Sequence, residues 1–92
     1  MIKTWKHKGL KDFFETGSTK GIPAKHSKRI RRVLDAIDTA AEITELDIPG
    51  FDLHELKGDR KGTWAITVTG NWRITFKFNN GDAYDVNYED YH

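Results

Sequence analysis

The polar residues best suited to acid–base chemistry gather in two segments, one in the middle of the sequence and one at its end. His54 and Lys57 lie three residues apart, and Asp90, Tyr91 and His92 are the last three residues. Histidine changes its charge near neutral pH, so His54 and His92 are candidates for a general base and a general acid. The sequence leaves open which of the two takes which part.

Arg73 adds a positive charge from a strand-like run between these two segments. Cleavage of an RNA backbone needs a base for the ribose 2′-hydroxyl, an acid for the departing 5′-oxygen, and a cation for the charge that grows on the phosphate. An arginine fork or a lysine can stabilise that charge. Asp90 could orient a histidine or take a proton itself, and Tyr91 could donate a hydrogen bond or stack on a base. The substrate supplies the nucleophile, so we expect no metal and no cofactor.

Each of these residues also has an ordinary structural explanation. A single histidine is more often a surface or packing residue, and an arginine in a strand often pairs with a neighbouring strand. Lys57, Arg60 and Lys61 stand in a segment that is first of all a charged turn, and they are candidates for phosphate binding only if the other groups converge beside them. Taken one by one, the residues support a nuclease only weakly.

The charges are divided unevenly along the chain. Residues 1–34 carry a net charge of +8 and residues 35–92 carry −7, which together give the overall +1. Four of the basic residues recur at helical spacing, namely Lys25, Lys28, Arg29 and Arg32. This pattern favours a basic face for a polyanion, and the alternative is an ordinary solvated surface.

The elements that must position these groups begin with helices. Residues 2–6 alternate like a short strand, and residues 7–15 predict a short helix that ends near Gly17. Pro23 suits the start of a second helix, whose buried stripe consists of Ile30, Val33, Leu34 and Ile37. The segment Thr39-Ala40-Ala41-Glu42 predicts a capping box for a further short helical turn through Leu46.

The second half of the sequence is typical of strands. Residues 51–56 alternate imperfectly, and residues 64–69 and 72–78 alternate well. The pairs Gly70-Asn71 and Asn80-Gly81 predict tight hairpin turns. A last strand would turn its apolar side to the core through Tyr84, Val86 and Tyr88.

This alternation predicts which face of the sheet carries the polar groups. Because Trp72, Ile74 and Phe76 would lie under the helices, Arg73 must point to the opposite, open face. His54 has the parity to share that face. We therefore expect a single α+β domain over residues 1–92, in the order β-α-α-β-β-β, with its helices on one face of a mostly antiparallel sheet. No cysteine, signal peptide or membrane span is evident.

Several segments become distinctive when they are taken together. They are IKTWKHKGL (residues 2–10), LDAIDTA (34–40), LHELKGDR (53–60), NWRITF (71–76), GDAY (81–84) and NYEDYH (87–92). On these segments the sequence resembles the HigB-type toxins of bacterial toxin–antitoxin systems. This group, also called plasmid maintenance killer proteins, belongs to the RelE/ParE superfamily. The resemblance covers essentially the whole length and implies a RelE-like fold.

The resemblance also implies an activity and partners. Such toxins are ribosome-dependent endoribonucleases, without a metal or cofactor, that cut messenger RNA in the decoding site. They are cytoplasmic and are held in check by a co-encoded HigA-type helix-turn-helix antitoxin, through which alone they meet operator DNA. The basic helix with Lys25, Lys28, Arg29 and Arg32 would then bind ribosomal RNA phosphates.

By motif, the family's catalytic positions correspond to His54, Asp90, Tyr91 and His92. Its basic active-site positions correspond to Lys57 and Arg73. Close relatives can place another arginine where this chain has Thr69, and Arg60 or Lys61 could take over its role.

Two alternatives remain open at this point. ParE-type relatives share the topology but poison DNA gyrase without cleaving RNA, and the charge asymmetry alone would fit a plain nucleic-acid-binding module. Fold similarity does not decide among these. The pair of His54 and His92 favours the nuclease, since a gyrase poison has no need of them.

Overall fold

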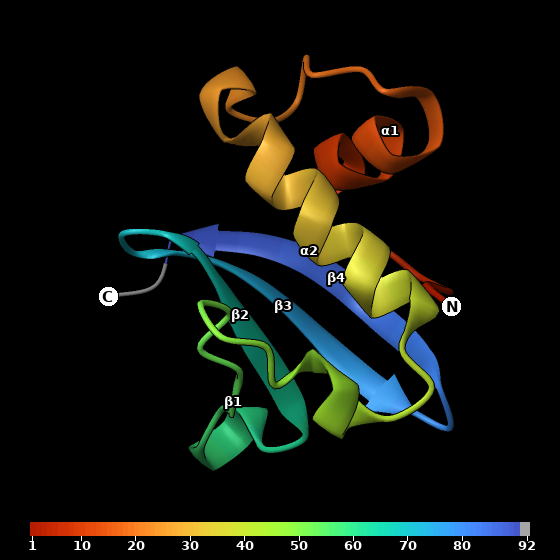
Figure 1. Ribbon diagram of the computed structural model, residues 1–92, viewed down its shortest axis with the longest axis vertical. Coiled ribbons are helices and arrows are strands. Elements are labelled where there is room, and N and C mark those ends of the chain that lie inside the picture. The colour runs from red at the N-terminus through yellow and green to blue at the C-terminus, as the bar shows by residue number, and fades with distance from the viewer. Residues whose placement is uncertain (91–92) are drawn as a thin grey trace.

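A computed structural model describes residues 1–90 of the chain. The predictions made for Tyr91 and His92 lie outside the described residues. Figure 1 shows two helices followed by an antiparallel sheet. The elements are α1 (Lys8–Thr16), η1 (Ala24–His26), α2 (Ser27–Thr39), η2 (Ile43–Leu46), β1 (His54–Glu55), η3 (Gly58–Arg60), β2 (Thr63–Thr69), β3 (Trp72–Asn79) and β4 (Asp82–Asp90), where η marks a short 3₁₀ turn.

The helical layer agrees with the sequence pattern. Helix α1 begins after His7, whose Nδ1 accepts a hydrogen bond from the Leu10 amide, and it ends at Gly17 in the left-handed conformation. Helix α2 follows a 3₁₀ turn that Pro23 introduces. Its predicted stripe is confirmed, because all four side chains are fully buried in the core: Ile30, Val33, Leu34 and Ile37.

The sheet has four antiparallel strands in the order β1-β2-β3-β4. Both predicted hairpins are confirmed, one at Gly70-Asn71 between β2 and β3 and one at Asn80-Gly81 between β3 and β4. In the second turn both central residues have positive φ, 51° at Asn80 and 81° at Gly81. An asparagine followed by a glycine tolerates this geometry, which is why the pair is a reliable hairpin signal.

The segment expected as a strand at residues 2–6 is only partly one. It makes two isolated parallel bridges to β4, Ile2 with Ala83 and Trp5 with Val86. Its backbone amides at Lys3 and Lys6 donate to Ala83 O and Val86 O. The segment therefore covers the outer edge of β4 without forming a regular ladder, and the first strand of the predicted order is reduced to these bridges.

Two further expectations are wrong in detail. A β-bulge at Asp85, which has φ 55°, shifts the register of β4 so that Tyr84 pairs with Lys77 and faces the open side. Tyr84 is therefore not a core residue, although Val86 and Tyr88 are. The capping box lies at Glu42 and Glu45, whereas Thr39 belongs to the last turn of α2.

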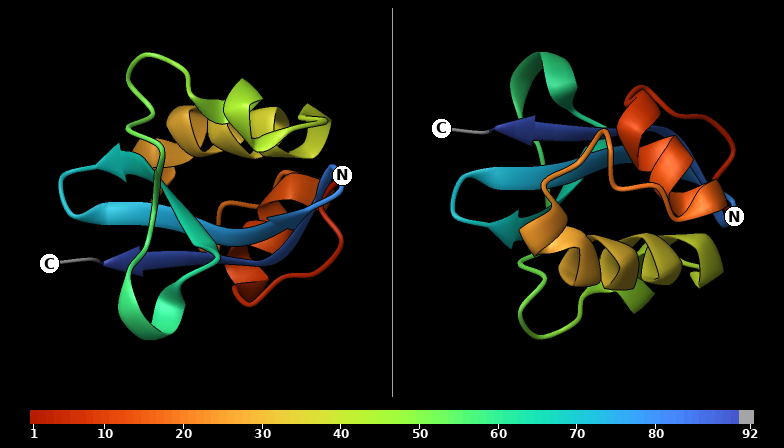
Figure 2. Two further views of the ribbon diagram at one scale, coloured as in Figure 1. Left: turned by 90° about the horizontal axis from the view of Figure 1, so that it is seen from below. Right: turned by 90° about the horizontal axis from the view of Figure 1, so that it is seen from above.

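The sheet separates two different surfaces. Helix α2 lies across one face, and η3 lies on the opposite side (Figure 2). The apolar core lies between the helices and the sheet, with contributions from Leu10, Leu34, Ile66, Ile74 and Phe76. The face turned away from α2 is called the open face below, and it carries the polar residues that the alternation of the strands excludes from the core.

Candidate functional site

His54 lies on the open face, as its parity predicted. It pairs with Ala65 across β1 and β2, and Ala65 in turn pairs with Thr75 on β3. Its Nδ1 is 2.9 Å from the carbonyl oxygen of Asp52. A carbonyl only accepts, so Nδ1 must carry the hydrogen of this bond, and the tautomer with a free lone pair is the one that has it on Nε2. This tautomer leaves His54 with the nitrogen that a general base needs.

A hollow of about 340 Å³ lies beside His54. The residues that line it come from β1, η3 and the two residues between them, and they include two of the predicted phosphate-binding residues, Lys57 and Arg60. Lys57 and Arg60 follow His54 within one short connection, so the local turn at η3 is enough to bring them together. The structure therefore unites a proton acceptor with two cations on the open face.

Arg73 lies farther along the open face, near the hairpin between β2 and β3. It pairs with Glu89 of β4 in the register of the sheet, which places both side chains on the same face. One guanidinium nitrogen, Nη1, donates to Gly70 O at 2.7 Å and to Trp72 O at 3.3 Å. These carbonyls hold Arg73 at the hairpin end of the open face, next to the end of β4.

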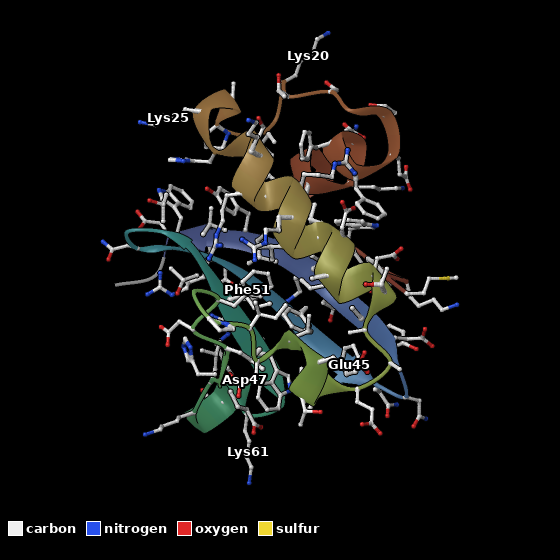
Figure 3. The ribbon with its side chains drawn as sticks, in the orientation of Figure 1. Lys20, Lys25, Glu45, Asp47, Phe51 and Lys61 are labelled. Carbon is white, nitrogen blue, oxygen red and sulfur yellow. The ribbon has the colours of Figure 1, made fainter. Side chains whose placement is uncertain are left out.

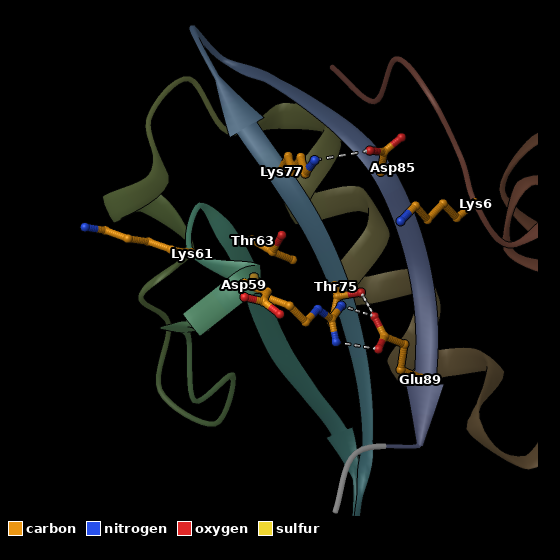
Figure 4. Close-up of a pocket in the computed structure, with 9 residues that line it drawn as sticks. Lys6, Asp59, Lys61, Thr63, Thr75, Lys77, Asp85 and Glu89 are labelled. Carbon is orange, nitrogen blue, oxygen red and sulfur yellow. Dashed lines mark hydrogen bonds and ion pairs between the residues drawn. The ribbon is translucent and has the colours of Figure 1, made fainter. Parts of the chain in front are cut away.

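Arg60 links the hollow beside His54 to Glu89, the residue that pairs with Arg73. Its Nη1 and Nη2 donate to the two carboxylate oxygens of Glu89 at 2.8 and 2.6 Å, as the dashed lines at Glu89 show in Figure 4. The hydroxyl of Thr75 also donates to this carboxylate. The hydrogen bonds from Arg60 are the main cause that lowers the pKa of Glu89, and they outweigh the partial burial that would raise it.

This ion pair lines a second hollow, of about 190 Å³. Basic and acidic side chains alternate around it (Figure 4), and its nine residues are Lys6, Asp59, Arg60, Lys61, Thr63, Thr75, Lys77, Asp85 and Glu89. Lys77 lies 3.8 Å from Asp85. Because three carboxylates accompany four cations, this hollow is not strongly positive. Lys61, the third predicted phosphate ligand, extends away from the centre of the hollow.

Asp90 is the last residue that the structure describes, and it pairs with Trp72. Alternation therefore gives Asp90 the parity of the helix-bearing face, whereas Glu89 has the parity of Arg73. Sequence reasoning did not include Glu89 or Thr75 among the residues of the site. The signal was present for Glu89, because the same alternation that assigned Tyr88 to the core gives its neighbour to the other side.

The predicted basic surface lies away from the open face, on η1 and α2. Lys25 and Lys28 are exposed there, and Lys25 extends into solvent (Figure 3). Arg29 is different from what its spacing suggested, because its Nη2 donates to Gly50 O and Thr67 O and its guanidinium lies over the ring of Phe51. Arg32 is exposed like the two lysines, although its guanidinium also lies over that ring. The structure brings none of these four residues to the hollows described above.

Within residues 1–90, no group of three or more His, Asp or Glu side chains is arranged to hold a metal ion. No helix of this part of the chain is both long and apolar enough to cross a membrane.

Comparisons with known proteins give the family. The model of the RelE-like toxin of the type II toxin–antitoxin system HigB matches residues 3–92. The chain is 63% identical to Endoribonuclease HigB of Proteus vulgaris over all 92 residues of both chains. It is 31% identical to Toxin HigB-1 of Vibrio cholerae over 85 residues, which cover 90% of each chain.

Two solved structures share the fold. One is a YoeB–YefM complex from Staphylococcus aureus, with a TM-score of 0.60 and 16% identity over 100% of this chain and 95% of that one. The other is a YoeB/ParE toxin from Agrobacterium tumefaciens, with a TM-score of 0.54 and 15% identity over 97% and 99%. The four-stranded sheet with its two helices is thus a RelE-like architecture. The chain belongs to the HigB-like family, the RelE-like toxins of type II toxin–antitoxin systems.

Proposed function

We propose that this chain is a ribosome-dependent endoribonuclease that cleaves translated messenger RNA in the ribosomal A site. The observation that carries the proposal is the open face of the sheet, where His54 presents Nε2 as a proton acceptor beside Lys57, with Arg73 on the same face. The name and the 63% identity of the Proteus vulgaris relative support the same activity.

The reaction uses the substrate's own nucleophile. A general base, His54 or a residue of the C-terminal segment, takes the proton of the ribose 2′-hydroxyl, and that oxygen attacks the adjacent phosphorus. Arg73 and Lys57 stabilise the negative charge on the phosphoryl oxygens. An acid from the C-terminal segment, for which His92 and Tyr91 are the candidates, gives a proton to the departing 5′-oxygen. Asp90, the third residue predicted there, has the parity of the helix-bearing face. The upstream fragment then ends in a 2′,3′-cyclic phosphate and the downstream fragment begins with a 5′-hydroxyl.

The dependence on the ribosome follows from positioning. The hollows on the open face are small, about 190 and 340 Å³, and mixed in charge, so they offer little to hold a messenger with its 2′-oxygen in line with the scissile bond. Positioning of this kind contributes a large part of the barrier reduction in such reactions. We infer that the decoding site supplies it, and that the exposed Lys25, Lys28 and Arg32 on the opposite layer contact ribosomal RNA phosphates.

The partner that restrains the toxin is an antitoxin encoded with it, since the family is defined by such pairs. We infer that it is of the HigA type, with a helix-turn-helix domain, and that the toxin reaches operator DNA only through it. A toxin of this kind acts in the cytoplasm, where the ribosomes are.

Primer extension on a translated transcript tests the proposal. We expect induction of the toxin without its antitoxin to produce cuts within the reading frame, and an inhibitor of translation to abolish them. The downstream fragments should accept a 5′-phosphate from a polynucleotide kinase, because they begin with a hydroxyl. Intact transcripts together with altered DNA supercoiling in arrested cells would establish a gyrase poison instead.

A further inference from the structure

We propose that the ion pair between Arg60 and Glu89 is a clamp that positions the two halves of the active site, and that Arg60 is therefore a positioning residue and not a phosphate ligand. The inference rests on the proposed nuclease function and concerns how its groups are brought to the right distance.

The clamp joins segments that the sheet itself keeps apart. Because the strand order is β1-β2-β3-β4, His54 on β1 and Glu89 on β4 lie at opposite edges of the sheet. Arg60, in the short turn η3 after β1, reaches over β2 and β3 to Glu89. The hydroxyl of Thr75, on the neighbouring strand β3, donates to the same carboxylate. One carboxylate thus holds three elements in a fixed relation.

The segments that the clamp joins are those that carry the candidate chemistry. On one side, η3 follows His54 and Lys57 directly, and Arg60 lines the same hollow as both of them. On the other side, Glu89 directly precedes the last three residues of the chain. A shift of η3 would move His54 and Lys57 relative to Arg73, which pairs with Glu89 in the sheet. A misplacement of about 1 Å is enough to slow such a reaction roughly 100-fold.

Arg60 and Glu89 form a bidentate ion pair with each other. Arg60 gives two donors to Glu89 in a bidentate arrangement, with donor–acceptor distances of 2.8 and 2.6 Å. The Glu89 side chain is 22% exposed and that of Arg60 is 41% exposed, so the pair is partly shielded from water. The hydrogen bonds from Arg60 lower the pKa of Glu89, so the folded protein favours the ionised carboxylate. A phosphate would have to displace this carboxylate before it could bind the fork of Arg60.

Substitution of Glu89 by glutamine separates the two roles because they predict opposite signs. If Arg60 binds phosphate, Glu89→Gln removes a competing carboxylate and should leave cleavage unchanged or increase it. If the pair is a clamp, Glu89→Gln loosens η3 and should reduce the cleavage rate at saturating ribosomes by about 10- to 100-fold, with little change in ribosome binding. Arg60→Lys keeps the charge but loses the fork, and the clamp predicts a similar loss for it.

The experiment measures single-turnover cleavage of messenger on purified ribosome complexes programmed with one codon in the A site. It compares the wild type, Glu89→Gln, Arg60→Lys and the exchanged pair Arg60→Glu with Glu89→Arg. Asp12→Asn is the matched control, because Lys8 and Asp12 form an ion pair of similar length on α1, far from the open face. Thermal unfolding of each variant shows that it remains folded, and the pH profile of cleavage distinguishes positioning from proton transfer.

We expect Glu89→Gln and Arg60→Lys to cleave more slowly with an unchanged shape of the pH profile, and the exchanged pair to recover part of the rate. Full activity of folded Glu89→Gln overturns the clamp and leaves the nuclease function intact. A changed limb in the pH profile would make Glu89 a proton-transfer group and also overturns the clamp. A wild type that fails to cut overturns the proposed function, and the clamp's role in catalysis with it.

Discussion

The guanidinium of Arg29 lies 5.1 Å above the centre of the Phe51 ring, on the helix-bearing side of the sheet. The same guanidinium donates to the carbonyl oxygens of Gly50 and Thr67. Phe51 is fully buried beneath α2 (Figure 3). Arg29 therefore fastens α2 to the loop before β1 and to β2, although its sequence position had suggested a surface charge for binding RNA.

Replacement of Arg29 by alanine should destabilise the fold. Hydrogen bonds from a charged donor are worth about 1.5–3 kcal/mol each, and the loss would leave two carbonyl groups without this donor. We expect a decrease of about 1–3 kcal/mol in the free energy of unfolding, which in a domain of this size lowers the melting temperature by roughly 5–15 °C. Thermal unfolding followed by circular dichroism measures it. Lys28→Ala, one position earlier and exposed, is the control, and an equal loss in both would contradict the role of Arg29.

Lys25 and Lys28 remain candidates for contact with ribosomal RNA, because both are exposed. Reversal of both charges to glutamate should weaken ribosome binding and flatten its dependence on salt by about one to two units of the log–log slope, as released counterions drive such contacts. Stability should change little, since exposed charges contribute little to it. Lys11→Glu with Lys20→Glu makes the same change of net charge elsewhere. If both double variants bind ribosomes equally, the surface at η1 and α2 has no special role.

His7 should make the stability of the fold depend on pH. Its Nδ1 accepts the hydrogen bond that caps α1, and burial lowers its pKa below the usual 6.5. Protonation removes the acceptor. The folded state thus prefers the neutral ring, so the stabilising contribution is present above pH 6.5 and is lost as the pH falls through the lowered pKa of the folded state.

The matching variant is His7→Asn, because asparagine is a good N-cap at any pH. Melting temperatures measured between pH 7.5 and 5 should decrease more for the wild type than for this variant. The other three histidines are present in both proteins, so their contribution cancels in the difference. Parallel curves for the two proteins would show that the cap at His7 does not titrate in this range.

The parts of the fold that follow from the sequence are those with local signals. The buried stripe of α2 needs only helical spacing, and the turn at Asn80-Gly81 needs only two residues that accept positive φ. The assignment of Arg73 to the open face follows from alternation within β3, which has no irregularity on its own. In each case the information lies within a few residues of the feature.

What the sequence did not reveal depends on contacts between distant segments. The bulge at Asp85 turns Tyr84 away from the core, and it is fixed partly by Thr4, whose hydroxyl accepts from the Asp85 amide. The pair of Arg60 and Glu89 joins residues 29 positions apart. The spacing of apolar and polar residues along the sequence does not indicate either of these contacts. The roles of Asp90, Tyr91 and His92 stay predictions from the resemblance.

The last prediction concerns those terminal residues together with His54. Removal of residues 91–92 takes away a candidate acid, and His54→Ala takes away the candidate base whose Nδ1 donates to Asp52 O. Loss of one such group typically slows a reaction about 100- to 10,000-fold. Each variant should therefore lose toxicity in cells and cleavage on ribosomes. The double variant should lose little more than the poorer of the two single ones, because groups that act in one proton-transfer step are not additive.

The measurement is cleavage of translated messenger by purified protein, with thermal unfolding as a check that each variant is folded. Lys11→Ala on the exposed side of α1 serves as the control and should keep full activity. A truncated protein that folds and still cuts at the rate of the wild type would remove the end of the chain from the mechanism. In that case the acid must be sought among the described residues of the open face, where Glu89 is already bound to Arg60.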